Sequence, residues 1–420
     1  MNAKTNPIEH KESIKKELDR CVMCGLCSDH CPTYKITGVE AESPRGRLAL
    51  MNGLWNKELE ADTPLLKHLD HCLGCRACEA VCPSQVNYGH LLDQTRAHLN
   101  ATSDKNKNKM ALRAMNLIAQ GGSTIRLFFR LLWLTQRLKL PVIARKMGLL
   151  RVLKLDRLEG YLPSLQPRPK WKAVYYPKNE CVGRVGLFLG CVAQEVDSQT
   201  LSASIRLLTK LGYEVHIPRM QNCCGALHLH AGYAEHADDL AQKNHHSFSQ
   251  SGIQTIVSVA SGCTTTLADS MNTINKKEGH ADDTFRIKDI NHFLLTENRL
   301  TSDLFAPLAQ NIAIHDPCSL RQILKQQQAP YELLKLIPEV RISELPGNQY
   351  CCGAAGTHMI TYPEKADLLR SSKIQALSNT QIIATSNIGC ALHLAAGLRS
   401  RQNPIEVLHP VTILERQLRL

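Results

Sequence analysis

The feature that most constrains this chain is a run of four cysteines that occurs twice near its N-terminus. Both runs read C-x2-C-x2-C-x3-C-P, and each cysteine of the second run lies 51 residues after its counterpart in the first. The first run holds Cys21, Cys24, Cys27 and Cys31, and the second holds Cys72, Cys75, Cys78 and Cys82. Such runs are typical of [4Fe–4S] clusters, because one tight loop can supply three of the four thiolates.

This spacing predicts two clusters that share their ligands crosswise, because the fourth cysteine of each run binds the other cluster in two-cluster ferredoxins. We therefore expect one [4Fe–4S] cluster on Cys21, Cys24, Cys27 and Cys82, and the other on Cys72, Cys75, Cys78 and Cys31. Crosswise binding places the clusters close together, which makes them an electron relay. Two structural zinc sites are the alternative, but three cysteines at successive two-residue spacings suit iron–sulfur far better.

The number of cysteines also indicates metal rather than disulfides. The chain of 420 residues has 17 cysteines, an odd number that does not suit a fully paired disulfide framework. Residues 1–20 contain no apolar core with a cleavage site, so we expect no secretory signal and reduced thiols. No run of about 18 apolar residues occurs, so we expect no transmembrane segment.

A second repeat occupies the C-terminal half, and both of its copies contain the sequence Cys-Cys-Gly. Its first copy holds Cys191, Cys223, Cys224 and Cys263, and its second holds Cys318, Cys351, Cys352 and Cys390, at offsets of 127 or 128 residues. These cysteines could hold a further metal cluster, form a redox-active thiol pair, or pack as small hydrophobic side chains. The recurrence at four matched positions favours a metal or redox role, whereas the unmatched Cys181 is expected to be structural.

Histidines near the second repeat give a weaker signal. His315 precedes Cys318 by three residues together with Asp316, and His292 and His409 lie near apolar runs. Each could bind metal or orient a ligand, but a satisfied, partly buried histidine is the favoured interpretation.

Alternation of β-rich runs and helical stretches predicts the architecture of the C-terminal half. Four short runs precede cysteines: Val185–Leu189, Thr255–Val259, Ile312–Ile314 and Gln381–Ala384. Strands separated by helices indicate βαβ units and a mostly parallel sheet, whose carboxyl edge is where ligands bind. We therefore predict an α+β multidomain protein: a helical two-cluster ferredoxin-type module (1–105), a basic helical linker (106–178), and two repeated α/β Cys-Cys-Gly domains (179–303 and 304–420).

The basic linker carries nearly all of the net charge. Residues 110–172 hold 13 Lys and Arg against two acids, a net of +11, while the whole chain has a net charge of +12. We expect helices here, with Pro141 ending or kinking the first. A concentrated basic amphipathic segment favours contact with an anionic membrane surface or an acidic partner subunit. A solvated helical hairpin is the alternative, and the lack of a recognised nucleic-acid module argues against nucleic-acid binding.

These features together resemble the glycolate oxidase iron–sulfur subunit family. The resemblance covers essentially the whole chain and includes the segments Ser43–Leu48 (SPRGRL) and Leu408–Val411. It implies a complex with flavin-containing subunits that oxidise glycolate to glyoxylate, with FAD bound in those partners only. Electrons would leave through this subunit toward membrane quinone, at the cytoplasmic side of the inner membrane. Related iron–sulfur subunits serve L-lactate oxidation and anaerobic glycerol-3-phosphate dehydrogenase.

The resemblance places no catalytic residue in this chain, and the sequence agrees with that division of labour. Alcohol oxidation usually requires a flavin or nicotinamide, yet no G-x-G-x-x-G opens a helix here. The Cys-Cys-Gly modules also resemble those of heterodisulfide reductase, which supply five cysteines to an unusual cluster. Ala260 and Asn387 replace one of those five in each repeat, so we assign no cluster ligands there. An electron-transfer subunit is therefore favoured over a disulfide reductase or a metal-bearing binding protein.

Overall fold

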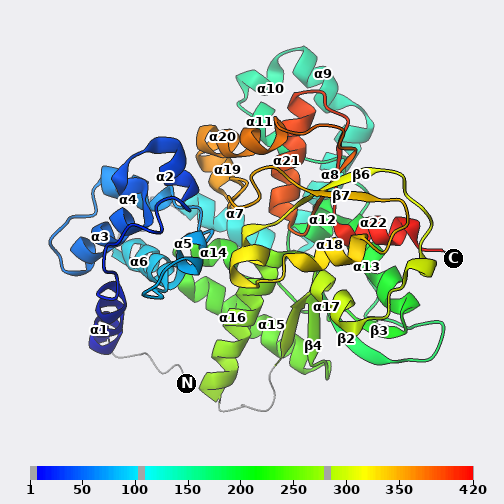
Figure 1. The fold of residues 1–420 in the computed structure, drawn as a ribbon, viewed down its shortest axis with the longest axis horizontal. Helices are drawn as coiled ribbons and strands as arrows, with labels where there is room; N and C mark the ends of the chain where they lie inside the picture. The colour runs from blue at the N-terminus through cyan, green and yellow to red at the C-terminus, as the bar shows by residue number, and fades with distance from the viewer. Residues whose placement is uncertain (1–6, 103–108, 279–284, 420) are drawn as a thin grey trace.

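A helical unit forms the N-terminal part of the chain in a computed structural model that describes residues 7–102, 109–278 and 285–419 (Figure 1). Its elements are α1 (Pro7–Leu18), α2 (Pro32–Thr37), η1 (Glu40–Glu42), α3 (Pro44–Trp55), α4 (Thr63–Asp70), α5 (Ala77–Ala80) and α6 (Tyr88–Thr102). Helix α3 begins at Pro44, where the Ser43 hydroxyl accepts a hydrogen bond from the Gly46 amide. Met51 and Leu91 are fully buried in the core of the unit. The predicted helical module is confirmed.

The basic segment that follows is also helical, as predicted. It contains α7 (Lys109–Gln120), α8 (Ser123–Arg137), α9 (Leu140–Lys146), α10 (Leu149–Val152) and α11 (Asp156–Tyr161). Pro141 lies in the first turn of α9, where its missing N–H costs no hydrogen bond. Gly148, with φ of 72°, separates α9 from α10. Within the described residues, no helix is both long enough and apolar enough to cross a membrane.

The first Cys-Cys-Gly repeat is a sheet covered by helices. Its strands are β1 (Val174–Tyr175), β2 (Gly183–Phe188), β3 (Tyr213–His216), β4 (Thr255–Ser258) and β5 (Arg286–Asp289). They lie in the order β1-β3-β2-β4-β5, and every pair except β1 with β3 is parallel. The helices are α12 (Ala193–Val196), α13 (Ser198–Lys210), α14 (Ala226–His230), α15 (Ala234–Ser249), α16 (Ser261–Glu278) and α17 (Ile290–Glu297).

The second repeat has the strand order of β3-β2-β4-β5 in the first. Its strands β6 (Asn311–His315), β7 (Arg341–Glu344), β8 (Ile382–Thr385) and β9 (Glu406–Leu408) form an all-parallel sheet in the order β7-β6-β8-β9. The remaining elements are η2 (Ser302–Leu304), η3 (Ser319–Ile323), α18 (Gln328–Leu334), α19 (His358–Thr361), α20 (Pro363–Ile374), α21 (Ile388–Ser400) and α22 (Pro410–Gln417). All four predicted strands and the parallel pairing are therefore confirmed, together with the α+β fold class.

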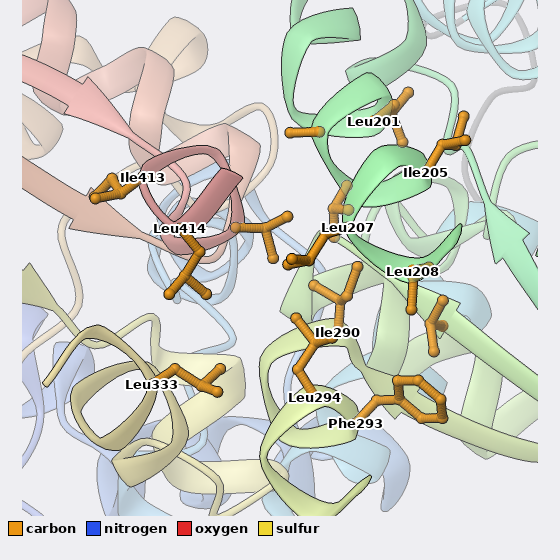
Figure 2. Packing of buried hydrophobic residues seen from close by; sticks show 14 of the residues in the cluster. Leu201, Ile205, Leu207, Leu208, Ile290, Phe293, Leu294, Leu333, Ile413 and Leu414 are labelled. Carbon is orange, nitrogen blue, oxygen red and sulfur yellow. The ribbon is translucent and has the colours of Figure 1, made fainter. Parts of the chain in front are cut away.

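The two repeats share one hydrophobic core. Figure 2 shows Leu207 of α13 and Leu294 of α17, from the first repeat, opposite Leu414 of α22 and Leu333 of α18, from the second, within one cluster of buried side chains. This common core fixes the two sets of cysteines relative to each other. The domain boundaries stay predictions, and the one between residues 105 and 106 lies outside the described part of the chain.

At Gly46, helix α3 approaches the backbone of η1 more closely than any residue with a side chain would allow. A Cβ atom added there would lie 2.0 Å from the carbonyl oxygen of Glu40, because α3 starts directly against η1. We expect Gly46→Ala to destabilise the N-terminal unit by about 1–3 kcal/mol through overpacking. Gly160→Ala is the matched control, because a Cβ atom there meets nothing within 4 Å. Urea unfolding followed by the visible absorbance of the metal centres tests this, and equal midpoints for the two variants would contradict it.

Candidate metal centres

The structure gathers the eight N-terminal cysteines into two pockets. Cys21, Cys24, Cys27 and Cys82 line the first pocket, and Cys31, Cys72, Cys75 and Cys78 line the second. Pro44 and Tyr88 border both pockets, as does Cys78, so the two lie side by side. The two sets of four are those that crosswise spacing predicts, and their role as ligands remains a prediction. Four soft thiol groups around one pocket suit an iron–sulfur cluster or zinc.

Matched backbone turns direct the cysteines into these pockets. Met23 (φ 57°) and Gly25 (φ 83°) adopt the left-handed conformation in the first loop, and Gly74 (φ 59°) and Arg76 (φ 56°) adopt it in the second. Met23 corresponds to Gly74, and Gly25 corresponds to Arg76, at the same 51-residue offset as the cysteines. Because side chains disfavour this region, Met23 and Arg76 indicate a constraint on loop shape that outweighs the local strain.

A buried arginine lies against the second pocket. Arg47 is 1% exposed, donates from Nη1 to the Thr33 hydroxyl at 3.0 Å, and lies 3.9 Å from the Cys31 sulfur. Burial by itself would lower the pKa of Arg47, but the negative charges of Cys72, Tyr88, Cys31 and Glu42 outweigh it and raise the pKa. The guanidinium therefore stays protonated and provides a buried positive charge beside the second pocket.

The same arginine begins a charged network that reaches the second repeat. Its Nη2 donates to Glu42 Oε2 at 2.7 Å, and Glu42 Oε1 lies 2.5 Å from His71 Nδ1 and 3.0 Å from His68 Nδ1. Lys365 of α20 completes the network, 3.3 Å from Glu42. Burial favours the neutral acid, but the hydrogen bonds from the histidines and the charge of Arg47 lower the pKa of Glu42 to about 2. The ionised carboxylate thus joins the helical unit to the second repeat.

The cysteines of the first Cys-Cys-Gly repeat converge at the carboxyl edge of its sheet. The sulfurs of Cys191 and Cys223 lie 3.1 Å apart, and hydrogen bonds connect Cys223 to Cys224 and Cys224 to Cys263. The hydrogen bond with Cys191 lowers the pKa of Cys223 and raises that of Cys191. Gly225, with φ of 87°, allows the turn between the adjacent cysteines and α14.

The second repeat arranges its four cysteines in the same way and adds a histidine. Hydrogen bonds connect Cys318 to Cys351, Cys351 to Cys352, and Cys352 to Cys390. The interpretation of His315 as a satisfied histidine is wrong, because it is 2% exposed and its Nε2 has no hydrogen-bond partner among the described residues. Asp316 and His409 are likewise bonded through one atom only. Asp316 accepts a hydrogen bond from Arg321 and His409 caps α22 through the Val411 amide, while Asp316 Oδ1 and His409 Nε2 have no partner among the described residues.

The second pocket contacts the cysteines of the second repeat. Cys75 packs with Cys318 in the hydrophobic cluster that contains Cys351. Burial, followed by the charge of Cys318, raises the pKa of Cys75 well above its ordinary value. Sequence reasoning did not find this contact, because no motif relates residues more than 200 positions apart. The exposed Cys181 lies outside both pockets and both groups of cysteines.

Models of two known protein families match the N-terminal unit and the two repeats. The model of the "4Fe-4S dicluster domain" matches residues 17–86, and that of the "Cysteine-rich domain" matches residues 185–268 and 312–395. The dicluster match favours iron–sulfur over the zinc alternative.

Several relatives match over most of the chain. The probable glycolate oxidase iron–sulfur subunit of Bacillus subtilis is 33% identical over 93% of this chain and 91% of its own length. The glycolate oxidase iron–sulfur subunit of Escherichia coli is 30% identical over 96% of this chain and 94% of its own length. One subunit of the fumarate reductase (CoM/CoB) of Methanothermobacter marburgensis is 24% identical over 95% of this chain and 72% of its own length.

Removing the Glu42 carboxylate should weaken the N-terminal unit. We expect Glu42→Gln to cost roughly 3 kcal/mol, because it leaves a buried arginine without its counter-ion. The pKa of Glu42 falls from 4.5 unfolded to about 2 folded, so its contribution is complete above pH 4.5 and is lost as the pH falls toward 2.

The penalty should therefore be present at pH 5 and shrink as the pH falls toward 2, in urea unfolding followed by the visible absorbance of the metal centres. Glu40→Gln is the control, because its ion pair with Arg45 is exposed and should contribute no more than about 1 kcal/mol. A penalty for Glu42→Gln no larger than that of the control would show that the buried network does not stabilise the unit.

Proposed function

Because the chain belongs to the family of glycolate oxidase iron–sulfur subunits, we propose that it carries electrons from flavin-containing partner subunits that oxidise glycolate to glyoxylate toward membrane quinone. This chain would be the iron–sulfur subunit of an oxidoreductase complex, and the partner subunits would carry out the oxidation of the substrate. The observation that carries this proposal is the crosswise gathering of eight cysteines in two adjoining pockets.

We assign one [4Fe–4S] cluster to each pocket. Cys21, Cys24, Cys27 and Cys82 would hold the first, and Cys72, Cys75, Cys78 and Cys31 the second. When bound, such clusters accept and release single electrons, whereas hydride removal from an alcohol belongs to a flavin, with FAD expected in the partners. The residues of this chain hold the sulfurs in place, and Arg47 supplies a buried positive charge beside the second set.

Exposure of the first pocket supports it as the side that faces a partner. Cys24 is exposed, and the flanking Val22 and Leu26 are 68% and 59% exposed, so apolar side chains surround the cysteine at the surface. The second pocket lies farther in, against the second repeat. A partner that docks on the first loop would reach the outer pocket first.

Glycolate is favoured as the substrate of the complex, and L-lactate is the alternative. Both relatives named for glycolate oxidase match more than nine-tenths of this chain. Lactate utilization protein A of Bacillus subtilis is 25% identical over only 55% of it. A panel of 2-hydroxy acids, assayed with the complex purified at native expression, tests this choice. Turnover of lactate with glycolate inert would assign the chain to lactate oxidation.

The helices α8–α10 support peripheral attachment to the cytoplasmic face of an anionic membrane. Large apolar side chains that are at least 42% exposed occur at Leu127, Phe128, Leu131, Leu134, Leu138, Leu140, Val142, Ile143, Met147, Leu149, Val152, Leu153 and Leu155. On α8 the spacing of Leu127, Leu131 and Leu134 places these three leucines on one face. The ends of the basic segment are packed, since the Ala119 carbonyl accepts from Cys223 and the Tyr161 hydroxyl donates to Met359. In Figure 1, α9 and α10 project at the top of the molecule.

A bilayer fits this surface better than an acidic protein does. Apolar side chains insert at the headgroup boundary while the surrounding Lys and Arg side chains contact anionic lipid, at about 1 kcal/mol per basic residue near the surface. Residues 110–172 hold 13 basic residues and two acids, so the charge of the segment complements an anionic surface. We propose no binding to nucleic acid.

Loss of one outer cysteine should interrupt electron transfer. We expect Cys24→Ser to lose the signal of one cluster in electron paramagnetic resonance after dithionite reduction, and to abolish glycolate-dependent dye reduction by the complex. Cys181→Ser is the control, because Cys181 is exposed and lies outside both pockets. Unchanged spectra and activity in Cys24→Ser would refute the ligand assignment.

Charges placed on the apolar surface should prevent membrane binding. We expect the double variant Met147→Glu with Val152→Glu, at positions 75% and 79% exposed, to reduce sedimentation with phosphatidylglycerol vesicles at least tenfold. Met220→Glu is the control, because Met220 is 73% exposed outside this segment. Binding of the wild type should weaken at high salt. Failure of the wild type to sediment with these vesicles at low salt would exclude membrane attachment through α8–α10.

A further inference from the structure

Charged and hydrogen-bonding side chains are distributed unequally between the two N-terminal pockets. Arg47, Thr33 and Tyr88 line the second pocket and are 1%, 1% and 4% exposed. Resting on the proposed function, which assigns a [4Fe–4S] cluster to each pocket, we propose that Arg47 and Thr33 raise the reduction potential of the second cluster above that of the first. One electron then passes from the first cluster, which is oxidised, to the second, which is reduced, and no proton is transferred.

The Thr33 hydroxyl is placed to donate a hydrogen bond to a sulfur of the second set. Its Oγ1 lies 3.2 Å from Cys31 Sγ and 3.0 Å from the Glu42 carbonyl oxygen. Arg47 Nη1 donates to this hydroxyl oxygen at 3.0 Å and to the same carbonyl at 2.5 Å. The carbonyl therefore has a donor already, and a charged thiolate is the stronger acceptor. The hydroxyl proton points to Cys31 once that cysteine is deprotonated.

The charge of Arg47 is not cancelled by its partner Glu42. Arg47 Nη1 lies 3.9 Å from Cys31 Sγ, and Nη2 donates to Glu42 Oε2 at 2.7 Å. The same carboxylate also pairs with Lys365 at 3.3 Å. Two positive charges and one negative charge leave this group with a net charge of +1. Lys365 belongs to α20, so the second repeat contributes to the electric field at the second pocket.

A nearby positive charge and hydrogen bonds to sulfur both favour the reduced cluster, because reduction adds one negative charge. The Tyr88 hydroxyl provides another such hydrogen bond, which it donates to Cys72 Sγ at 3.5 Å. Since Arg47 and Thr33 are buried, solvent screens their effect much less than it would at the surface. The surroundings of the second pocket therefore make a cluster there easier to reduce.

The first pocket also has an arginine from α3, but this arginine is exposed. Arg45 lines the first pocket, its side chain is 34% exposed, and it pairs with Glu40 at 2.6 Å. The pairs Glu40–Arg45 and Glu42–Arg47 have the same five-residue spacing. Solvent weakens the exposed pair and leaves the buried pair largely unscreened. The same helix thus presents a screened charge to one pocket and an unscreened charge to the other.

The counterpart of the Thr33 hydroxyl differs in the same direction. The 51-residue offset that relates Cys31 to Cys82 also relates Thr33 to Ser84, which lines the first pocket and is only half-buried. Among the described residues, the Ser84 hydroxyl makes no hydrogen bond to a sulfur. Water near the exposed Cys24 also favours reduction of the first cluster, and we expect the fixed charge of Arg47 to outweigh it because that charge is buried.

A redox titration of the full chain, purified without oxygen and followed by electron paramagnetic resonance, tests this proposal. The signal that Cys24→Ser loses belongs to the first cluster, and we expect the other signal to appear at a higher potential. At a fixed potential, Thr33→Val should lower the ratio of reduced to oxidised second cluster by about threefold. Arg47→Gln should lower it by about tenfold, which corresponds to about 59 mV for a one-electron couple. Thr33→Ser keeps the hydroxyl and should keep the wild-type potential.

Ser84→Ala and Arg45→Gln are the matched controls, because both residues line the first pocket. Both should leave the potential of the second cluster unchanged. Iron content shows whether each variant keeps both clusters, and Thr33→Val decides alone if Arg47→Gln does not fold, because it removes no charge.

Three results would overturn the proposal: a first cluster that is reduced at the higher potential, an unchanged potential in Thr33→Val, or equal shifts in the control variants. Each of these results leaves both clusters in place and so leaves the proposed function standing. Absence of both cluster signals from the wild type would instead refute the proposed function itself.

Discussion

The convergence of thiol groups from two distant loops is the constraint on which the N-terminal half depends. Four sulfurs can surround one pocket only if Cys82 reaches the first loop and Cys31 reaches the second, so the two runs must face each other. The left-handed residues at matched positions of both loops show that the backbone accepts local strain to meet this requirement. The small helical core around Met51 and Leu91 then supports two pockets at once.

The charged network around Arg47 and Glu42 connects this unit to the rest of the molecule. Its buried members satisfy one another, so separating the helical unit from α20 would leave charges without partners. The resulting attachment brings Cys75 into contact with Cys318 and Cys351. Two groups of cysteines that are far apart in the sequence therefore form one continuous sulfur-rich region.

The two Cys-Cys-Gly repeats illustrate how one framework can support different sites. Both place four cysteines at the carboxyl edge of a parallel sheet, and both use a glycine with positive φ after the adjacent pair. They differ at the strand end, where one repeat has Phe188 in a hydrophobic cluster and the other has His315 with an unpaired nitrogen. Because the repeats share the core of Figure 2, the two groups of cysteines are held in a fixed position relative to each other.

The sequence by itself indicated four of the strands, the two repeats and the two sets of cysteines, because short spacings and strand–helix alternation are local properties of the chain. It placed Pro141 at a helix boundary but not the break at Gly148, since a single glycine does not reveal whether a helix continues. Only the tertiary structure decided that Cys75 meets Cys318, that Lys365 completes the Glu42 network, and that the ring of His315 lies close to two thiols. These contacts join residues more than 35 positions apart, and their energy comes from burial, which no local pattern encodes.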